Sequence, residues 1–361
     1  MTMSKQLIYV GGYASPEMEG IQLFNLDYTS GQLTYVKGVM GIENPSFLIL
    51  TKDLQCLYAV VEASEYHGTP GGGVVGYEIS EEGSILKPLN NQPTNGDHPC
   101  HLSLSHSEDA LFVTNYSGGS VSAYQIMKDG NLSVQSDFHQ HQGSSVNLKR
   151  QEGPHAHMAH LTPDGRHLLV TDLGTDQLIA YQIHPQGKLV LIKDRCLELP
   201  PGSGPRHLTF SSSNKSMYLI NELGNTILVF AVDEDGLPAK ESIQEIKTLP
   251  SDFSEESTTA DIHVHPSGKF LYGTNRGHDS FCCYRILPNE QLELIGHVPT
   301  GGQSPRNFSI HPDGKWLVVA HQISGNILSF AVDKETGMLK QSDNQKLNLQ
   351  PSCVQFRHSS H

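Results

Sequence analysis

The segment PHAHMAHLTPDGRHLLVTDLGTD, residues 154–176, together with QLIAYQI, which follows it directly, decides the fold. Its opening HAHMAHL indicates a strand entered through a proline, and TPDGR has the Asp-Gly chemistry of a tight turn. HLLVTD then indicates an aliphatic strand that ends in polar residues, and QLIAYQI alternates as a third strand. The segment therefore predicts consecutive antiparallel strands joined by short turns.

A unit of this kind, about fifty residues long, occurs seven times along the chain. Successive copies start 54, 55, 51, 55, 45 and 46 residues apart, at Pro45, Pro99, Pro154, Pro205, Ala260, Pro305 and Pro351. Such self-similarity is typical of a circular β-propeller. We expect an all-β fold: a seven-bladed β-propeller with four antiparallel strands per blade, formed as a single domain by residues 1–361.

The two ends of the chain complement each other. The last copy stops after PSCVQF, residues 351–356, whereas the chain begins inside a unit with strands expected in residues 7–13, 20–27 and 31–40. One C-terminal inner strand plus three N-terminal strands would complete the seventh blade. This pairing closes the ring and removes an exposed sheet edge.

Composition limits the classes of partner. The chain carries 24 Lys and Arg against 38 Asp and Glu, a formal net charge of −14, which argues against a nucleic-acid or an anionic-membrane surface. The start MTMSKQLIYVGGY has no long apolar segment of a secretory signal, and no stretch resembles a membrane span. We therefore expect a cytoplasmic location.

The rare arginines fall at equivalent places in the repeats. In a propeller blade, the loop before the inner strand and the loop after the second strand emerge on the same face, around the central channel. Arg206 in GPRH and Arg276 in TNRG occupy such places, and planar guanidinium groups suit a carboxylate or a phosphate. Inter-blade salt bridges are the structural alternative for both.

Glu222 and two histidines are expected at the same mouth. Glu222 follows the strand MYLIN and could activate a water, although an ion pair with Arg206 or Arg276 would weaken it as a base. His155 and His157 alternate in PHAH, so they would share one side of an extended segment. Further candidates for substrate contact take equivalent positions, with hydrogen bonding between blades as the alternative: His101, Asn115, Asp172, Arg306 and His321.

Metal and nucleophile motifs are absent from the sequence. It contains no HExxH, EF-hand loop, CxxC pair, GxSxG elbow or Walker loop. His155, His157, Asp172 and Glu222 could in principle form a mixed nitrogen and oxygen shell, but their spacing supports this only weakly. We expect no metal and no cofactor.

Together these motifs resemble those of one family. IYVGGY, HPCHLS, PHAHMAHLTPDGRHLLVTDLGTD, GPRHLTF with YLINEL, and YGTNRGHDS are similar to segments of the 6-phosphogluconolactonases of the seven-bladed propeller type, which look like fungal carboxy-cis,cis-muconate lactonising enzymes. The resemblance spans essentially the whole chain. It implies a metal-independent site in which His157, Arg206, Glu222 and Arg276 match the positions proposed to act in the family.

The implied reaction is hydrolysis of a sugar δ-lactone, with 6-phosphogluconolactone and the pentose phosphate pathway as the expected context. Glu222 or His157 would take the proton of the attacking water, while one arginine stabilises the oxyanion and the other holds the phosphate. A muconate-type cycloisomerase or a non-catalytic interaction propeller are the alternatives. The sequence leaves open whether the small anionic sugar lactone is phosphorylated, which histidine acts, and the oligomeric state.

Overall fold

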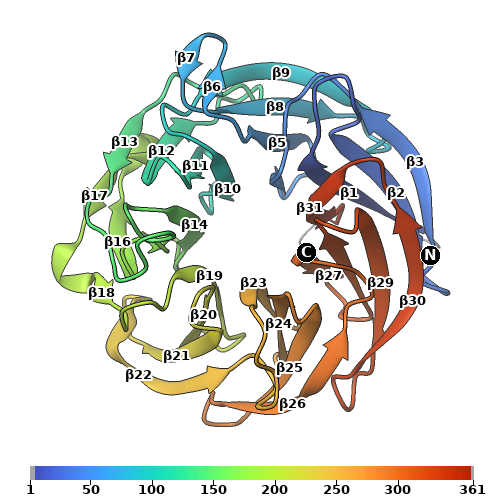
Figure 1. The fold of residues 1–361 in the computed structure, drawn as a ribbon. Helices are drawn as coiled ribbons and strands as arrows, with labels where there is room; N and C mark the ends of the chain where they lie inside the picture. The colour runs from blue at the N-terminus through green and yellow to red at the C-terminus, as the bar shows by residue number, and fades with distance from the viewer. Residues whose placement is uncertain (1–4, 359–361) are drawn as a thin grey trace.

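The computed structural model describes residues 5–358, which form a ring of seven small antiparallel sheets (Figure 1). Blades 1–3 contain these strands: β4 (Leu48–Leu50), β5 (Cys56–Val61), β8 (Gly73–Ile79) and β9 (Leu86–Pro93); β10 (Pro99–Leu104), β11 (Ala110–Asn115), β12 (Ser120–Gln125) and β13 (Asp137–Gln140); β14 (Ala156–Leu161), β15 (His167–Asp172), β16 (Gln177–Ile183) and the outer segments β17 (Leu189–Leu191) and β18 (Leu197–Glu198).

Blades 4–6 are regular four-stranded sheets. Their strands are β19 (Pro205–Phe210), β20 (Ser216–Asn221), β21 (Thr226–Val232) and β22 (Pro238–Lys247); β23 (Thr258–Val264), β24 (Phe270–Arg276), β25 (Ser280–Ile286) and β26 (Leu292–Pro299); β27 (Pro305–Ile310), β28 (Trp316–His321), β29 (Asn326–Val332) and β30 (Leu339–Lys346).

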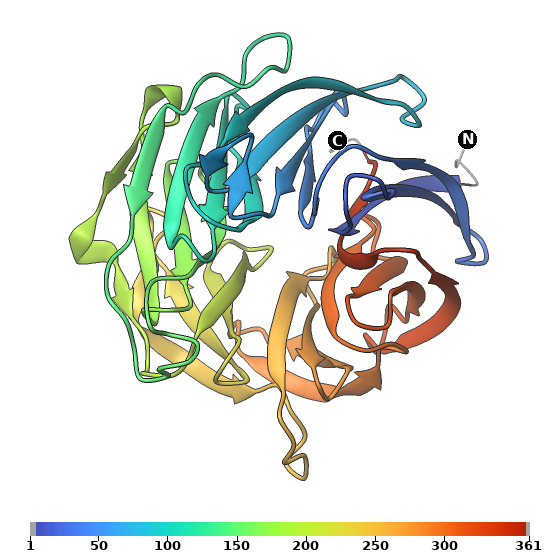
Figure 2. The same ribbon diagram turned by 45° about the horizontal axis from the view of Figure 1, so that its top comes forward.

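Blade 7 joins the two ends of the chain, as predicted. Its order is β3 (Leu33–Val39), β2 (Ile21–Asp27), β1 (Lys5–Tyr13) and β31 (Gln350–Phe356), with Ile8 paired to Phe356. The blue N-terminal and red C-terminal strands lie side by side in both ribbon views (Figures 1 and 2). The ring is thus closed by hydrogen bonds between the first and the last strands of the described chain.

The structure departs from the repeat pattern in three details. Blade 1 carries an extra hairpin, β6 (Glu65–Tyr66) with β7 (Thr69–Pro70). The outer edge of blade 3 is split by two 3₁₀ turns, η1 (Pro185–Gly187) and η2 (Lys193–Arg195). Several inner strands also begin a few residues away from the predicted position; the first, β4, starts three residues after Pro45.

Among residues 5–358, no helix is long and apolar enough to cross a membrane.

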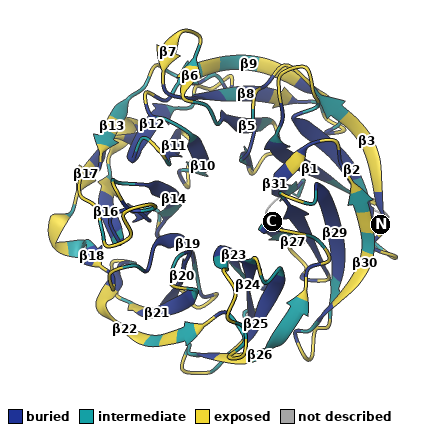
Figure 3. Ribbon diagram, viewed as in Figure 1, coloured by how far each residue is buried: buried dark blue, intermediate teal, exposed yellow. Residues whose placement is uncertain are grey.

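The hydrophobic core lies between the blades. Seven clusters of buried side chains occur in the described chain, and each joins two neighbouring blades. Phe270 and Phe281 of blade 5, for example, pack with Phe308 and Phe330 of blade 6. Figure 3 shows burial concentrated on the inner strands, while the outer strands are largely exposed. The inner strands are therefore held rigidly, which fixes the side chains that they direct at the channel.

A bulge recurs near the start of the inner strands and re-aims their side chains. In blade 4 the register passes from Pro205 directly to His207, so that Arg206 is the extra residue. The same shift makes His157 and Arg306 extra residues in blades 3 and 6. A threonine of the preceding blade fixes the bulge, as Thr171 Oγ1 does by donating to the carbonyl of Arg206 at 2.7 Å.

Candidate functional site

One face of the ring is the channel mouth, where the loops before the inner strands meet the residues that follow the second strands. The backbone N–H of Tyr116 donates to His98, that of Leu173 to His155, that of Glu222 to Gly204, and that of Gln322 to Ser304. This bond recurs in blades 2, 3, 4 and 6. The bond holds the residue after the second strand beside the start of the inner strand of the same blade, so that both lie at the channel mouth.

Glu222 lies at the centre of a buried cluster of arginines. Its Oε2 accepts from Nε of Arg206 at 3.0 Å and lies 2.9 Å from Nη2 of Arg276, while its Oε1 accepts from Arg150. Glu222 is 3 % exposed and Arg206 2 % exposed. Burial alone would raise the pKa of Glu222, but Arg276, Arg206 and Arg150 lower it from 4.5 to about 2.

The arginines remain cations in this setting. Burial, followed by the charge of Arg276, lowers the pKa of Arg206 to about 10, well above neutrality. Arg206 is also fixed by Nη1, which donates to the carbonyl of Ala260 at 2.6 Å, and Arg276 donates to the carbonyl of Thr259 at 2.7 Å. The carboxylate of Glu222 is thus shared by three guanidinium groups, and positive charge remains for an anion.

A fourth arginine approaches from blade 6. Arg306 lies 5.6 Å above the ring of Tyr13 and donates to Oε1 of Gln322 at 3.2 Å. The hydroxyl of Tyr13 donates to the carboxylate of Glu62 at 2.9 Å. We call Arg150, Arg206, Arg276 and Arg306 the arginine cluster.

Below the arginine cluster lies a small central cavity of about 10 Å³, which has room for about one water molecule. The chemically active side chains that line it are Cys100, His157, Arg206, His207, Arg306 and Asn307. Burial raises the pKa of the Cys100 thiol to about 12, so that it stays protonated and is a poor nucleophile. The cavity is therefore surrounded by cations and neutral proton acceptors.

His157 and His155 differ in their surroundings, although the sequence placed them on one side. His157 is buried, its Nδ1 has no hydrogen-bond partner among residues 5–358, and burial together with Arg206 holds its pKa well below the ordinary value. His155 instead stacks on Tyr116 with ring centres 4.6 Å apart and bonds the Tyr116 carbonyl through Nδ1 at 3.1 Å. His157 thus faces the cavity, whereas His155 braces Tyr116.

The other predicted substrate contacts divide into two groups. His101 and Arg306 lie on inner strands inside the channel. The ring centre of His101 lies 4.3 Å from that of Phe47 and 5.6 Å from that of His207. Asn115, Asp172 and His321 each end a second strand, are fully buried, and point into their own blades. Asn115 bonds Ser120 and Ser122, and Asp172 accepts from the backbone of His155, Gly174 and Thr175. The structure does not bring these three to the mouth.

In blades 2, 4 and 6 the residue after the end of the second strand faces the mouth instead. Alternation along a strand turns the terminal residue inward and the next one toward the channel. Tyr116, Glu222 and Gln322 hold this place in blades 2, 4 and 6, and each contacts the arginine cluster. For Asn115 and Asp172 the structural role is therefore the one that the contacts support.

An open hollow of about 510 Å³ lies outside Arg276, between blades 5 and 6. Its lining includes Arg276, Gln303 and Ser304, together with the carboxylates of Glu256 and Asp279. The Nε of Arg276 is buried and has no hydrogen-bond partner in the described chain. Arg276 thus lines the hollow and retains one donor without a partner among the described residues.

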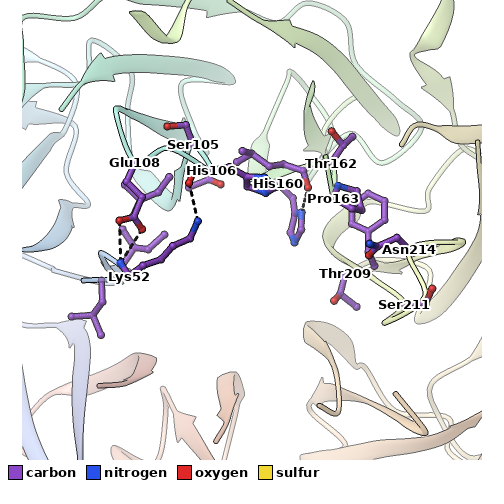
Figure 4. Close-up of a pocket in the computed structure, with 16 residues that line it drawn as sticks. Lys52, Ser105, His106, Glu108, His160, Thr162, Pro163, Thr209, Ser211 and Asn214 are labelled. Carbon is purple, nitrogen blue, oxygen red and sulfur yellow. Dashed lines mark hydrogen bonds between the residues drawn. The ribbon is translucent and has the colours of Figure 1, made fainter. Parts of the chain in front are cut away.

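A second pocket, of about 460 Å³, lies at the opposite face, where the inner strands end (Figure 4). Lys52 lines it, but its Nζ already donates to the carbonyl of His106 at 2.8 Å, and its backbone N–H donates to Glu108. Across the pocket, Nδ1 of His160 contacts the carbonyl of Leu161. The described residues that line this pocket include no arginine. The channel mouth, where the arginines lie, is therefore the better site for an anionic ligand.

Residues 5–358 contain no group of three or more His, Cys, Asp or Glu side chains arranged to hold a metal ion. His155, His157, Asp172 and Glu222 accordingly do not form a shell: Asp172 is bound by His141 and by backbone N–H groups of blade 3, and Glu222 is enclosed by arginines.

Sequence reasoning missed several residues of the site. Arg150 lies in the long loop between β13 and β14, where no repeat position identifies it. Tyr116 could have been found by moving one residue past the strand end. His207 and Asp261 stand beside residues that the pattern did select, Arg206 in GPRH and the blade start Ala260.

The sequence and the fold match known proteins. The family model described as "Lactonase, 7-bladed beta-propeller" matches residues 7–356. The chain belongs to this lactonase family. It is 32% identical to the 6-phosphogluconolactonase of Bacillus subtilis over 99% of both chains. It is also 32% identical to the 6-phosphogluconolactonase of Formosa agariphila, over 98% of this chain and 100% of that one.

A solved structure shows the same architecture. The periplasmic gluconolactonase PpgL of Pseudomonas aeruginosa superposes with a TM-score of 0.90 at 30% identity, covering 99% of this chain and 100% of that one. Members of the family are lactonases, and the protein is accordingly a hydrolase that opens a cyclic ester.

Proposed function

We propose that this lactonase hydrolyses 6-phosphogluconolactone to 6-phosphogluconate by metal-independent activation of water. The observation that carries the proposal is the arginine cluster, in which four cations from different parts of the ring meet at one mouth. Two curated relatives named 6-phosphogluconolactonase support the choice of lactone. The substrate is then a small anionic sugar lactone, with no nucleic acid or membrane as partner.

The cluster has two levels that suit the two ends of such a substrate. Arg206 and Arg306 line the central cavity, where the lactone carbonyl would meet water. Arg150, with 39 % of its side chain exposed, and Arg276, with 15 % exposed, lie nearer the solvent than Arg206, with 2 %. The inner pair would stabilise the oxyanion, and the outer pair would bind the phosphate through forked donors.

The reaction needs few parts. Water attacks the ring carbonyl, a tetrahedral oxyanion forms, and the ring oxygen leaves as an alcohol. Lactones of this class already open slowly in water, so positioned cations and a proton acceptor can supply the moderate barrier reduction required. A covalent nucleophile is unnecessary in this scheme.

The proposed setting is the pentose phosphate pathway in the cytoplasm, where the phosphorylated lactone would arise. The Pseudomonas aeruginosa structure is named a periplasmic gluconolactonase, so an unphosphorylated sugar lactone is the natural competitor. The two substrates differ by one phosphate, which the outer arginines should detect.

The test is the rate of acid release from freshly generated 6-phosphogluconolactone and from gluconolactone, each with and without EDTA. We expect faster hydrolysis of the phosphorylated lactone, unchanged by EDTA. Equal rates on both lactones would remove the phosphate from the proposal, and loss of activity in EDTA would contradict the metal-independent route. Conversion of a muconolactone alone would assign the site to a cycloisomerase.

A further inference from the structure

A buried Asp–His pair lies beside Arg206 and is used by no role assigned above. Nδ1 of His207, on β19, lies 2.7 Å from Oδ1 of Asp261, on β23 of the next blade. Asp261 is 1 % exposed and His207 5 % exposed. The other oxygen of Asp261 contacts Nε2 of His263 at 2.9 Å and accepts from Nδ2 of Asn307 at 2.6 Å. The carboxylate is thus held from three blades.

This arrangement fixes the tautomer of His207. A carboxylate can only accept, so Nδ1 of His207 carries the proton, and the lone pair of Nε2 accepts a long contact from Nη1 of Arg206. Nε2 lies 3.3 Å from Nη1 of Arg206, and His207 lines the water-sized central cavity. Burial, followed by the charge of Arg206, lowers the pKa of His207 to about 4, so that the ring is neutral at neutral pH. Its basic nitrogen thus lies at the water-sized cavity, where its contact with Arg206 is longer than the contacts of Arg206 and Arg276 with Glu222.

The competing proton acceptors are less suited. Both oxygens of Glu222 are bound by arginines, which leaves the carboxylate very weakly basic. His157 faces the same cavity, but its Nδ1 has no partner, so no carboxylate orients its ring or stabilises its protonated form. Of these three groups, His207 alone has the orienting acid of a general-base dyad.

We propose that His207, oriented by Asp261, is the general base that activates the hydrolytic water in the central cavity. The proposal rests on the lactonase function above. One O–H bond of water breaks and its proton moves to Nε2 of His207, while the water oxygen bonds the lactone carbonyl carbon and the carbonyl electron pair moves to its oxygen. When the oxyanion collapses, the ring C–O bond breaks and the ring oxygen takes the proton from Nε2. His207 ends neutral, and one water is consumed.

The experiment compares kcat and KM for His207→Gln and wild type on the better of the two lactones, after subtraction of spontaneous hydrolysis. We expect kcat to fall by about 10²- to 10⁴-fold with KM changed by less than about threefold, the range of a lost general base. His160→Gln is the matched control, because His160 is a half-buried imidazole on the inner strand β14 at the opposite end of the channel. It should keep wild-type kcat.

The positioning residue provides an independent test. Asp261→Asn keeps the volume of the side chain and removes its charge, and we expect the same selective loss of kcat. If His207→Gln does not fold, Asp261→Asn tests whether His207 is the general base. Wild-type kcat in a folded His207→Gln or Asp261→Asn protein, with wild type active, would overturn the role of His207. An inactive wild type would instead contradict the proposed function, so that the two failures are distinguishable.

Discussion

At the scale of single residues, Glu222 organises the site by neutralising part of the arginine cluster. Its carboxylate contacts Arg150, Arg206 and Arg276 and is almost completely buried. A buried carboxylate that serves three guanidinium groups fixes their geometry and prevents their mutual repulsion. This makes Glu222 a positioning residue whose loss affects the cations more than the proton transfer.

Glu222→Gln should therefore destabilise the fold as well as the activity. Removing one partner of a buried ionic network costs about 3–5 kcal/mol, because the remaining charges stay buried without compensation. We expect a clear fall in Tm that added phosphate partly reverses, since the anion takes the place of the carboxylate. Thermal unfolding with and without phosphate measures this, with exposed Glu234→Gln as control. A Glu222→Gln protein as stable as wild type would contradict the account.

The buried ionisable groups also predict how stability depends on pH. The pKa of His207 and that of His321 are both lowered to about 4, chiefly by burial, so between pH 6.5 and 4 the unfolded chain binds protons that the folded chain does not. The pKa of Glu222, lowered to about 2, adds a loss as the pH falls below 4.5. The free energy of unfolding should thus decrease steadily from pH 7 toward pH 3. Urea titrations that show constant stability from pH 7 to 5 would oppose this.

Sequence reasoning at this scale succeeded where the repeat dictates a position and failed by one residue elsewhere. Arg206 and Arg276 were placed at the mouth because the loops around a channel must converge. Asn115 and Asp172 were chosen as strand ends, yet the strand period turns them into the blade and exposes Tyr116 instead. Choosing between the residue that ends the second strand and the residue after it requires the exact register of the strand. The amino-acid sequence alone does not specify that register to one residue.

At the scale of elements, the bulge and one long loop complete the site. The bulge in β19 allows the consecutive residues Arg206 and His207 both to line the cavity, which an unbroken strand would prevent. The loop between β13 and β14 is closed by the backbone bond of Ser145 to Gln151 and delivers Arg150 across to Glu222. The bulge recurs from blade to blade, but the loop has no equivalent in the repeat, so the sequence pattern could not predict Arg150.

The loop should determine preference for the phosphate. Arg150→Ala removes one charged donor at the solvent side, and we expect KM for 6-phosphogluconolactone to rise by about tenfold or more, as for a lost charged hydrogen bond. KM for gluconolactone should change little. Lys149→Ala is the matched control, because it removes the same charge from an exposed neighbour on the same loop. An equal rise in KM for both lactones would show that Arg150 does not sense the phosphate.

At the scale of the whole molecule, the ring depends on the pairing of its two ends. β1 hydrogen-bonds β31, and the backbone N–H of Arg357 donates to the carbonyl of Leu7 at 2.8 Å. The seven repeats made this closure predictable, since a split unit has to be completed. The site needs closure because Tyr13, beside Arg306, comes from the N-terminal strand.

Removing residues 350–361 should therefore prevent folding, because it exposes the edge of β1 and opens the cluster between blades 6 and 7. A circular permutant should fold with nearly the wild-type Tm if it joins the two ends through a short Gly-Ser linker. Its new ends would lie at Pro288 and Asn289, in an exposed turn of blade 5. Far-UV circular dichroism and thermal unfolding compare the truncated chain with the circular permutant. Native-like unfolding of the truncated chain would contradict a closure-dependent ring.

The most direct test of the central claim, that the arginine cluster binds and hydrolyses the lactone, is a crystal structure with 6-phosphogluconate bound. We predict that the phosphate contacts Arg150 or Arg276 and that the carboxylate lies over the central cavity, within hydrogen-bond distance of Arg206 or Arg306. A product molecule seated instead in the opposite pocket of Lys52 and His160, with an empty mouth, would contradict the account.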